Sequence, residues 1–262
     1  MTFREHIKSR LTKDQRRRIR RAINVFETAC GPLTSIRQAL VKLNWPELPG
    51  GRSWRTAIPP VLRHSLVEGA ISYRYRDILM QKHPIEIALY MRLLWKIKPA
   101  TIIEIGSLQG GAAVWMGDLL NTFSIDGRVI SIDLRPPNPS YAPSNVKFLR
   151  GDADDLEATL GSDFFLSLPR PWLIIEDASH DYVTTLKVLC FFDPLLHSGE
   201  YMIVEDAAVP EIGQDSWHEG GAGRAIAQFM RCRGSDYEIE TGYCDYYGRN
   251  VTGNPNGYLR KK

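Results

Sequence analysis

Short apolar segments alternate with helical segments between residues 101 and 205, and this alternation constrains the fold more than any other feature. Strands are expected at 101–105, 128–133, 146–149, 172–176 and 201–205. Helices are expected between them, at 111–120, near 154–160 and at 182–189. Because a parallel strand pair needs a long crossover connection, this order predicts an α/β fold with a mostly parallel sheet covered by helices on both faces.

The flanking segments predict how the chain is divided. A helix is expected over 84–98, and closing antiparallel strands are expected at 237–239, 243–247 and 257–259. The stretch 44–60 is rich in proline and glycine, which is typical of a boundary. The interpretation is a basic helical extension and linker over 1–60, followed by a catalytic domain over 61–262.

The N-terminal segment is strongly basic. Residues 1–22 carry nine Lys and Arg residues against two acidic ones, although the net charge of the whole chain is only +3. A solvated helix face, an amphipathic helix on an anionic membrane and a nucleic-acid contact all remain open, but no RNA-binding fold signature supports the last. The four cysteines are scattered and suggest no disulfide framework, and neither a signal peptide nor an apolar run of the ~20 residues of a membrane span is recognised. We therefore expect a cytoplasmic protein, with peripheral contact at the inner membrane surface as an alternative.

The first expected strand ends in a glycine-containing turn. Ligands of doubly wound sheets bind beyond the carboxyl ends of the strands, and glycines there permit tight turns ahead of a helix N-terminus. The turn residues predicted to bind a cofactor are Glu104, Gly106, Ser107, Gly110 and Gly111. Their spacing differs from GxGxxG, and no GKS or GKT follows, which argues against a dinucleotide fingerprint and a P-loop.

Two acidic residues extend this pattern. Asp133 ends the next strand and can accept hydrogen bonds from both ribose hydroxyls, while Asp152 follows the third strand and can accept one from an adenine amino group. Either residue alone is equally well explained as a loop carboxylate that caps a helix. Together with Glu104 and Gly106, in this order, they favour S-adenosylmethionine over a nicotinamide cofactor.

The next two strands each end in a pair of carboxylates, Glu176-Asp177 and Glu205-Asp206. Carboxylates that converge at one sheet edge repel each other unless a cation or proton neutralises them, and Mg²⁺ prefers such oxygen ligands. His180 follows Asp177 by three residues and can accept a proton from a substrate hydroxyl near neutral pH. The alternatives are metal-free caps or ion-pair partners for the acids, and a capping or packing role for the histidine.

From about Tyr75 onward, the chain resembles the cephalosporin hydroxylase and rhamnosyl O-methyltransferase family. The resemblance rests on Pro84-Ile85-Glu86, the Glu104-Ile105-Gly106 turn, Asp177 with His180, Glu205-Asp206, and the segment Asn254-Pro255-Asn256-Gly257-Tyr258-Leu259. It implies a class I methyltransferase with a doubly wound, mostly parallel seven-stranded Rossmann-like sheet. It also implies Mg²⁺ on Asp177, Glu205 and Asp206, with His180 as general base. The N-terminal helical extension lies outside the resemblance.

The resulting hypothesis is a metal-dependent O-methyltransferase that uses S-adenosylmethionine. Its acceptor is a hydroxyl, most simply of a sugar in a glycolipid, polysaccharide or glycosylated natural product. Glu104, Gly106 and Ser107 would hold the amino-acid end of the cofactor, and Asp177 would contact both cofactor and metal.

Other functions remain open at this point. One is a catechol-like or antibiotic-tailoring O-methyltransferase, whose flat pocket would be lined by Trp217, Tyr243, Tyr246 and Tyr247. Another is a degenerate, non-catalytic methyltransferase fold that serves as a binding or scaffold subunit, and a third is a nucleic-acid-binding protein. The glycine-rich stretch 218–223 is expected to form a mobile loop over the site. Whether the protein forms a homo-oligomer is left open.

Overall fold

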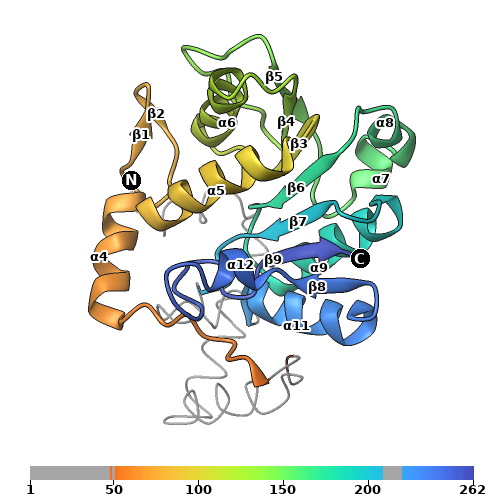
Figure 1. Ribbon diagram of the computed structural model, residues 1–262. Helices are drawn as coiled ribbons and strands as arrows, with labels where there is room; N and C mark the ends of the chain where they lie inside the picture. Colours follow the sequence, from red (N-terminus) through yellow and green to blue (C-terminus); the bar gives the residue numbers. More distant parts are fainter. Residues whose placement is uncertain (1–47, 49–50, 209–219) are drawn as a thin grey trace, which may run out of the picture. The chain divides into compact units, whose positions relative to one another are not determined.

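A seven-stranded sheet forms the centre of the computed structural model, which describes residue 48 and residues 51–208 and 220–262 (Figure 1). The strands are β3 (Thr101–Ile105), β4 (Arg128–Asp133), β5 (Val146–Arg150), β6 (Trp172–Glu176), β7 (Tyr201–Val204), β8 (Tyr237–Ile239) and β9 (Tyr258–Lys261). Their spatial order is β5-β4-β3-β6-β7-β9-β8. The first five are parallel, and β9 runs antiparallel to both β7 and β8. The predicted doubly wound, mostly parallel sheet is confirmed.

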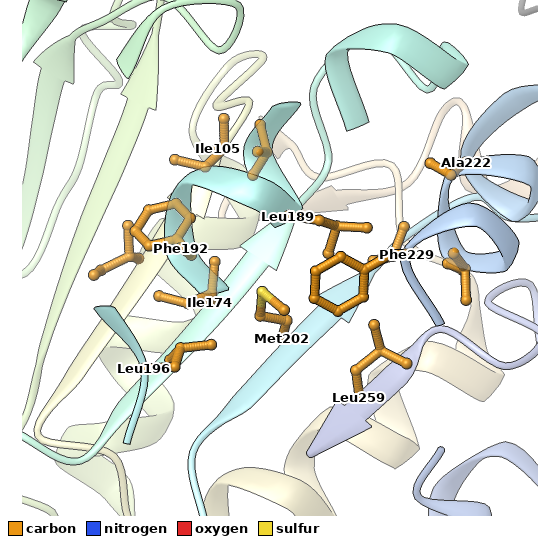
Figure 2. Packing of buried hydrophobic residues seen from close by; sticks show 14 of the residues in the cluster. Ile105, Ile174, Leu189, Phe192, Leu196, Met202, Ala222, Phe229 and Leu259 are labelled. Atoms are coloured by element: carbon orange, nitrogen blue, oxygen red, sulfur yellow. The ribbon is translucent and has the colours of Figure 1, made fainter. Parts of the chain in front are cut away.

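Helices cover both faces of this sheet. One face packs on α5 (Pro84–Ile97), α6 (Gly111–Thr122) and the short α12 (Thr241–Cys244). The other packs on α7 (Leu156–Thr159), α8 (Ser162–Leu166), α9 (Tyr182–Phe192) and α11 (Gly221–Arg233). Figure 2 shows this second core, where Ile174 and Met202 of the sheet meet Leu189 and Phe229 of the helices. Alternate residues of each strand therefore pack into opposite cores, which explains why β3 is buried along its whole length.

Three smaller elements precede or connect these helices. They are α4 (Pro60–Ala70), a hairpin of β1 (Arg74–Tyr75) and β2 (Ile78–Leu79), and the 3-10 turn η2 (Asp193–Leu195). Pro60 and Pro84 occupy the starts of α4 and α5, where a missing N–H costs nothing.

Two expectations about the C-terminal third are wrong. The stretch 243–247 does not form a strand, because Glu240 caps the short helix α12 and Tyr243 packs into the core, stacked on Tyr258. The glycine-rich stretch is not a loop from Gly221 onward, because its small residues begin α11. They are buried there and let α11 pack closely on α9. Residues 218 and 219 lie outside the described residues.

A buried carboxylate joins two segments that lie far apart in the sequence. Glu86 on α5 is 3% exposed, and its oxygens accept hydrogen bonds from Thr252 Oγ1, Gly253 N, Asn254 Nδ2 and Tyr258 Oη at 2.8–3.0 Å. Four donors satisfy the carboxylate and offset its burial. Two segments that carried the family resemblance, one around Glu86 and one from Asn254, are thus parts of one structural unit.

Arg52 attaches a part of the predicted linker to the C-terminal region. Its guanidinium donates to both oxygens of Asp245 at 2.6 and 2.8 Å, and also to the side-chain oxygens of Asn250 and Asn256. Residues near Arg52 therefore belong structurally with the sheet domain, while the division of function at residue 60 stays a prediction.

Candidate active site

The carboxyl ends of four neighbouring strands lie in register. Ile105 pairs with Ile132 on one side and with Glu176 on the other. Asp177 N donates to Ile105 O at 2.8 Å, and Glu205 N donates to Glu176 O at 2.9 Å. The sequence-predicted residues that follow β3, β4, β6 and β7 therefore meet at one edge of the sheet.

Glu104, Ser107, Ser131 and Asp133 form a connected group that we call the cofactor half of the site. Ser131 Oγ donates to the buried Glu104 carboxylate and lies 2.7 Å from Ser107 Oγ. Ser107 N donates to Asp133 Oδ2 at 3.1 Å. Burial raises the pKa of Glu104 to about 7, although the nearby Lys82 opposes the rise. These contacts bring together three of the predicted cofactor residues.

Close packing requires glycine at these turn positions, which the sequence alone did not show. Gly106 has φ +103°, and a Cβ atom there would lie 2.1 Å from the backbone oxygen of Asp177. Gly110 has φ +87° and faces the ring of Phe148, which a Cβ atom would approach to 2.7 Å. Gly111 begins α6 against Leu79. The chain therefore requires these glycines for its own close packing, whether or not a ligand also approaches them.

Asp152 lies apart from this group. It follows β5, which is two strands away from β3 in the sheet. Its Oδ1 accepts a hydrogen bond from Asp154 N at 2.9 Å, which is a local turn contact. Asp155, and not Asp152, caps α7. Asp152 is thus a loop carboxylate with a local contact, and its role toward adenine stays a prediction.

A lysine that the sequence analysis did not single out lies between the paired carboxylates. Lys82 Nζ is 2.6 Å from both Asp177 Oδ2 and Glu205 Oε2, and its side chain is 5% exposed. Tyr90 Oη donates to the other oxygen of Glu205 at 2.6 Å. Burial alone would lower the pKa of Lys82, but Asp177 and Glu205 raise it above its usual value. The ammonium therefore stays charged.

Asp177, His180 and Asp206 form a group suited to a metal ion, and together with Glu205 and Lys82 we call it the metal half. Each of the three offers one ligand atom, and these atoms lie within 4.8 Å of one another. His180 Nε2 is 3.3 Å from Asp206 Oδ2 and 3.9 Å from Asp177 Oδ1. The two carboxylates fit a hard divalent cation such as Mg²⁺, and the imidazole beside them is placed to exchange a proton with a bound hydroxyl. Of the predicted ligands, Asp177 and Asp206 lie in this group, and Glu205 adjoins it through Lys82.

Two residues of this group adopt an unusual backbone conformation. His180 and Asp206 have φ of +56° and +55°, in the left-handed region that costs free energy for residues other than glycine. Asn254 Oδ1 accepts a hydrogen bond from Asp206 N at 2.9 Å and so holds this conformation. Burial would lower the pKa of His180, but Asp206 and Asp177 reverse this and raise it.

A cavity of about 40 Å³ opens beside Asp206. Its wall includes Ile58, the α4 residues Leu66 and Val67, and His83. Mostly apolar side chains therefore border the predicted metal ligand on this side.

The aromatic residues expected to line a flat pocket are dispersed. Tyr243 is buried in the core, whereas Tyr246 and Tyr247 are about half exposed and contact each other. Trp217 lies outside the described residues. The three described members of the predicted set therefore do not line one common pocket.

A family model described as rhamnosyl O-methyltransferase/CmcI matches residues 69–262. The chain belongs to this family. The rhamnosyl O-methyltransferase of Mycobacterium leprae is 26% identical over 190 residues, covering 66% of this chain and 76% of that protein. The Mycobacterium tuberculosis protein of the same name is 23% identical over 174 residues, covering 65% and 70%.

Solved structures agree with this family. A structure of CmcI with Mg and SAM has a TM-score of 0.57 and 26% sequence identity, covering 73% of this chain and 77% of CmcI. A CmcI structure without ligand has a TM-score of 0.58 at the same identity. The predicted enzyme class, an S-adenosylmethionine-dependent O-methyltransferase, is thereby confirmed.

No helix within the described parts of the chain is both long and apolar enough to cross a bilayer.

Proposed function

We propose that the protein transfers the methyl group of S-adenosylmethionine to a sugar hydroxyl in a Mg²⁺-dependent reaction. The observation that carries this proposal is the convergence of Asp177, His180 and Asp206 at the sheet edge that also bears Glu104 and Asp133. Relatives named rhamnosyl O-methyltransferase support the sugar acceptor, and the CmcI structure with Mg and SAM supports both cofactors.

Each half of the site has a separate task in this reaction. Asp133 would hold the ribose, while Glu104 and Ser107 would hold the amino-acid end of the cofactor. Asp177 and Asp206 would hold Mg²⁺, and Glu205 would join them through a lone pair that its donors Lys82 and Tyr90 leave unused. When bound, Mg²⁺ lowers the pKa of a substrate hydroxyl. Fixing donor and acceptor at one sheet edge supplies much of the rate enhancement through orientation.

His180 would accept the hydroxyl proton at Nε2. Asp177 and Asp206, the two carboxylates near this nitrogen, would favour the imidazolium that results. With the proton removed, the acceptor oxygen attacks the sulfonium methyl carbon and S-adenosylhomocysteine leaves.

The cavity beside Asp206 would receive part of the acceptor. A sugar offers hydroxyls to the metal half and apolar C–H faces to Ile58, Leu66 and Val67. A glycolipid, a polysaccharide or a glycosylated natural product would meet both requirements. For a glycolipid, contact of the basic N-terminal segment with an anionic membrane would assist delivery, and liposome flotation of a chain lacking residues 1–22 tests this part separately.

Metal removal tests the proposed reaction. We expect EDTA treatment to lower methyl transfer from labelled S-adenosylmethionine to a rhamnosylated glycolipid by at least about 100-fold, with recovery on adding Mg²⁺. Binding of S-adenosylhomocysteine in EDTA serves as the control for an intact cofactor half. Full turnover in EDTA would show that the metal has no part in the reaction. A catechol acceptor assayed in parallel should give no product.

A further inference from the structure

Lys82 is a buried cation within the acidic cluster, outside the predicted ligand set. It lies two residues before α5 begins, in the connection from β2, and reaches the ends of both β6 and β7. An ammonium group has three donors, and Lys82 directs one to Asp177 Oδ2 and one to Glu205 Oε2. One side chain thus links the carboxylates that end two neighbouring strands.

Burying a lysine is costly unless its charge is paired. Apart from Asp177 and Glu205, the buried Glu104 also acts on Lys82 through its charge. Carboxylates at one sheet edge need a cation for neutralisation, and within the described residues Lys82 supplies one without any bound metal. The fold can therefore form its acidic cluster before a metal arrives.

The contacts of Lys82 also distinguish between the carboxylate oxygens. Lys82 engages Asp177 Oδ2, and Asp177 Oδ1 faces His180 at 3.9 Å. Glu205 is held at both oxygens, by Lys82 and by Tyr90. One oxygen of Asp177 thus remains directed toward His180 and Asp206, where the candidate ligand atoms gather.

We propose that Lys82 is the positioning residue and resident counter-charge of the metal centre. It holds Asp177 and Glu205 in place in the metal-free enzyme and leaves Asp177 Oδ1 for the metal. This inference rests on the proposed function, because it assumes that the acidic cluster binds Mg²⁺. As a consequence, the wild-type domain should fold stably without the metal. A variant that lacks the Lys82 charge should need the metal to hold its carboxylates together.

The variant Lys82→Met removes the charge and keeps most of the side-chain volume. We expect its melting temperature in EDTA to fall by about 10 °C, as for a broken buried ion pair, and most of this loss to be recovered in saturating Mg²⁺. The matched control is Tyr90→Phe, which removes a neutral hydrogen bond to the same Glu205. Its smaller loss should be equal with and without Mg²⁺. A role of Lys82 in packing alone would give K82M the same loss in both conditions, and that result would overturn the inference.

The double variant K82M/E205Q decides the matter if K82M alone does not fold. Removing Lys82 and Glu205 together returns the cluster to the net charge it has in wild type, with Asp177 as the one carboxylate that has lost its ammonium partner. The double variant should therefore fold and melt well above K82M in EDTA. A double variant as unstable as K82M would overturn the inference. Failure of the proposed function has a different signature, because the wild-type enzyme itself would then show no Mg²⁺-dependent change in melting temperature and no Mg²⁺ binding by calorimetry.

Discussion

The cofactor half and the metal half lie at one edge of the same sheet, but contacts of very different sequence range hold them. In the cofactor half, Ser107 and Asp133 are 26 residues apart, and Ser131 and Glu104 are 27 apart. In the metal half, Lys82 reaches Asp177 over 95 residues and Glu205 over 123. One strand–helix–strand unit therefore builds the first half. In the second half, β6, α9 and β7 bring Asp177, His180 and Asp206 together, but Lys82 reaches them only when the whole domain closes.

Because of this difference, we expect substitutions in the two halves to have different effects on donor binding, catalysis and stability. A change in the cofactor half should weaken donor binding and leave the fold intact. A change among the long-range contacts of the metal half should alter the reaction or the stability of the domain, with less effect on donor binding.

The largest effect is expected at His180. His180→Ala removes the group placed to accept the proton, so kcat should fall by about 100-fold to 10,000-fold. Binding of S-adenosylhomocysteine, measured by calorimetry, should stay within about twofold of wild type. A parallel loss of cofactor affinity would show that the two halves are not independent.

The next largest effect is expected on the stability of the domain when the Glu86 carboxylate is removed. Glu86→Ala leaves Thr252, Gly253, Asn254 and Tyr258 without their acceptor, and we expect the free energy of unfolding to drop by about 3 kcal/mol or more. Denaturant unfolding measures this. Glu238→Ala serves as the control, since Glu238 forms a half-exposed pair with Arg260 whose loss should cost about 0.5 kcal/mol or less. Similar losses for the two variants would contradict the anchoring role of Glu86.

A smaller effect is expected at Asp133. Asp133→Asn leaves one carbonyl oxygen where two carboxylate oxygens accept from Ser107 N and Arg135 N. We expect the affinity for S-adenosylhomocysteine to fall about tenfold, equivalent to about 1.4 kcal/mol. The Mg²⁺-induced rise in melting temperature should be the same as in wild type, and its loss would contradict the separation of the halves.

The smallest effect concerns pH. Burial raises the pKa of Glu104 to about 7 in the folded, ligand-free protein, well above its value in an unfolded chain. The folded state therefore holds a proton that the unfolded state releases, so this contribution to stability is full at acid pH and is lost as the pH rises through 7.

Melting temperatures between pH 5 and pH 8 test this sign. Wild type should lose stability toward pH 8, and Glu104→Gln should lose a few degrees less over the same range. Part of the dependence should remain in the variant, because burial raises the pKa of Glu176 to about 7 as well. Identical pH profiles for the two proteins would show that Glu104 does not titrate in this range.

The sequence by itself determined the five parallel strands and the order of the acidic residues along them. Strands 101–105, 128–133 and 172–176 were predicted with their observed bounds, because short buried strands between helices are continuous apolar runs with clear ends. Once these strands are parallel neighbours, Asp133, Asp177 and Glu205 must meet at one edge. The local pattern wrongly predicted a strand at 243–247, where core packing of Tyr243 favoured a helical turn.

Only the tertiary structure decided which groups neutralise and position the carboxylates at the ends of these strands. No local pattern singled out Lys82 or Tyr90 as a site residue, and Asn254 entered only as part of the family resemblance. These residues reach Glu205 and Asp206 only when α5 and the C-terminal loop pack against β7. The same holds for Gly106, whose need for glycine comes from the backbone of Asp177 in a neighbouring strand. The periodicity of the sequence predicts the face on which a residue lies. It does not predict partners 48–123 residues apart, which depend on how the whole chain folds.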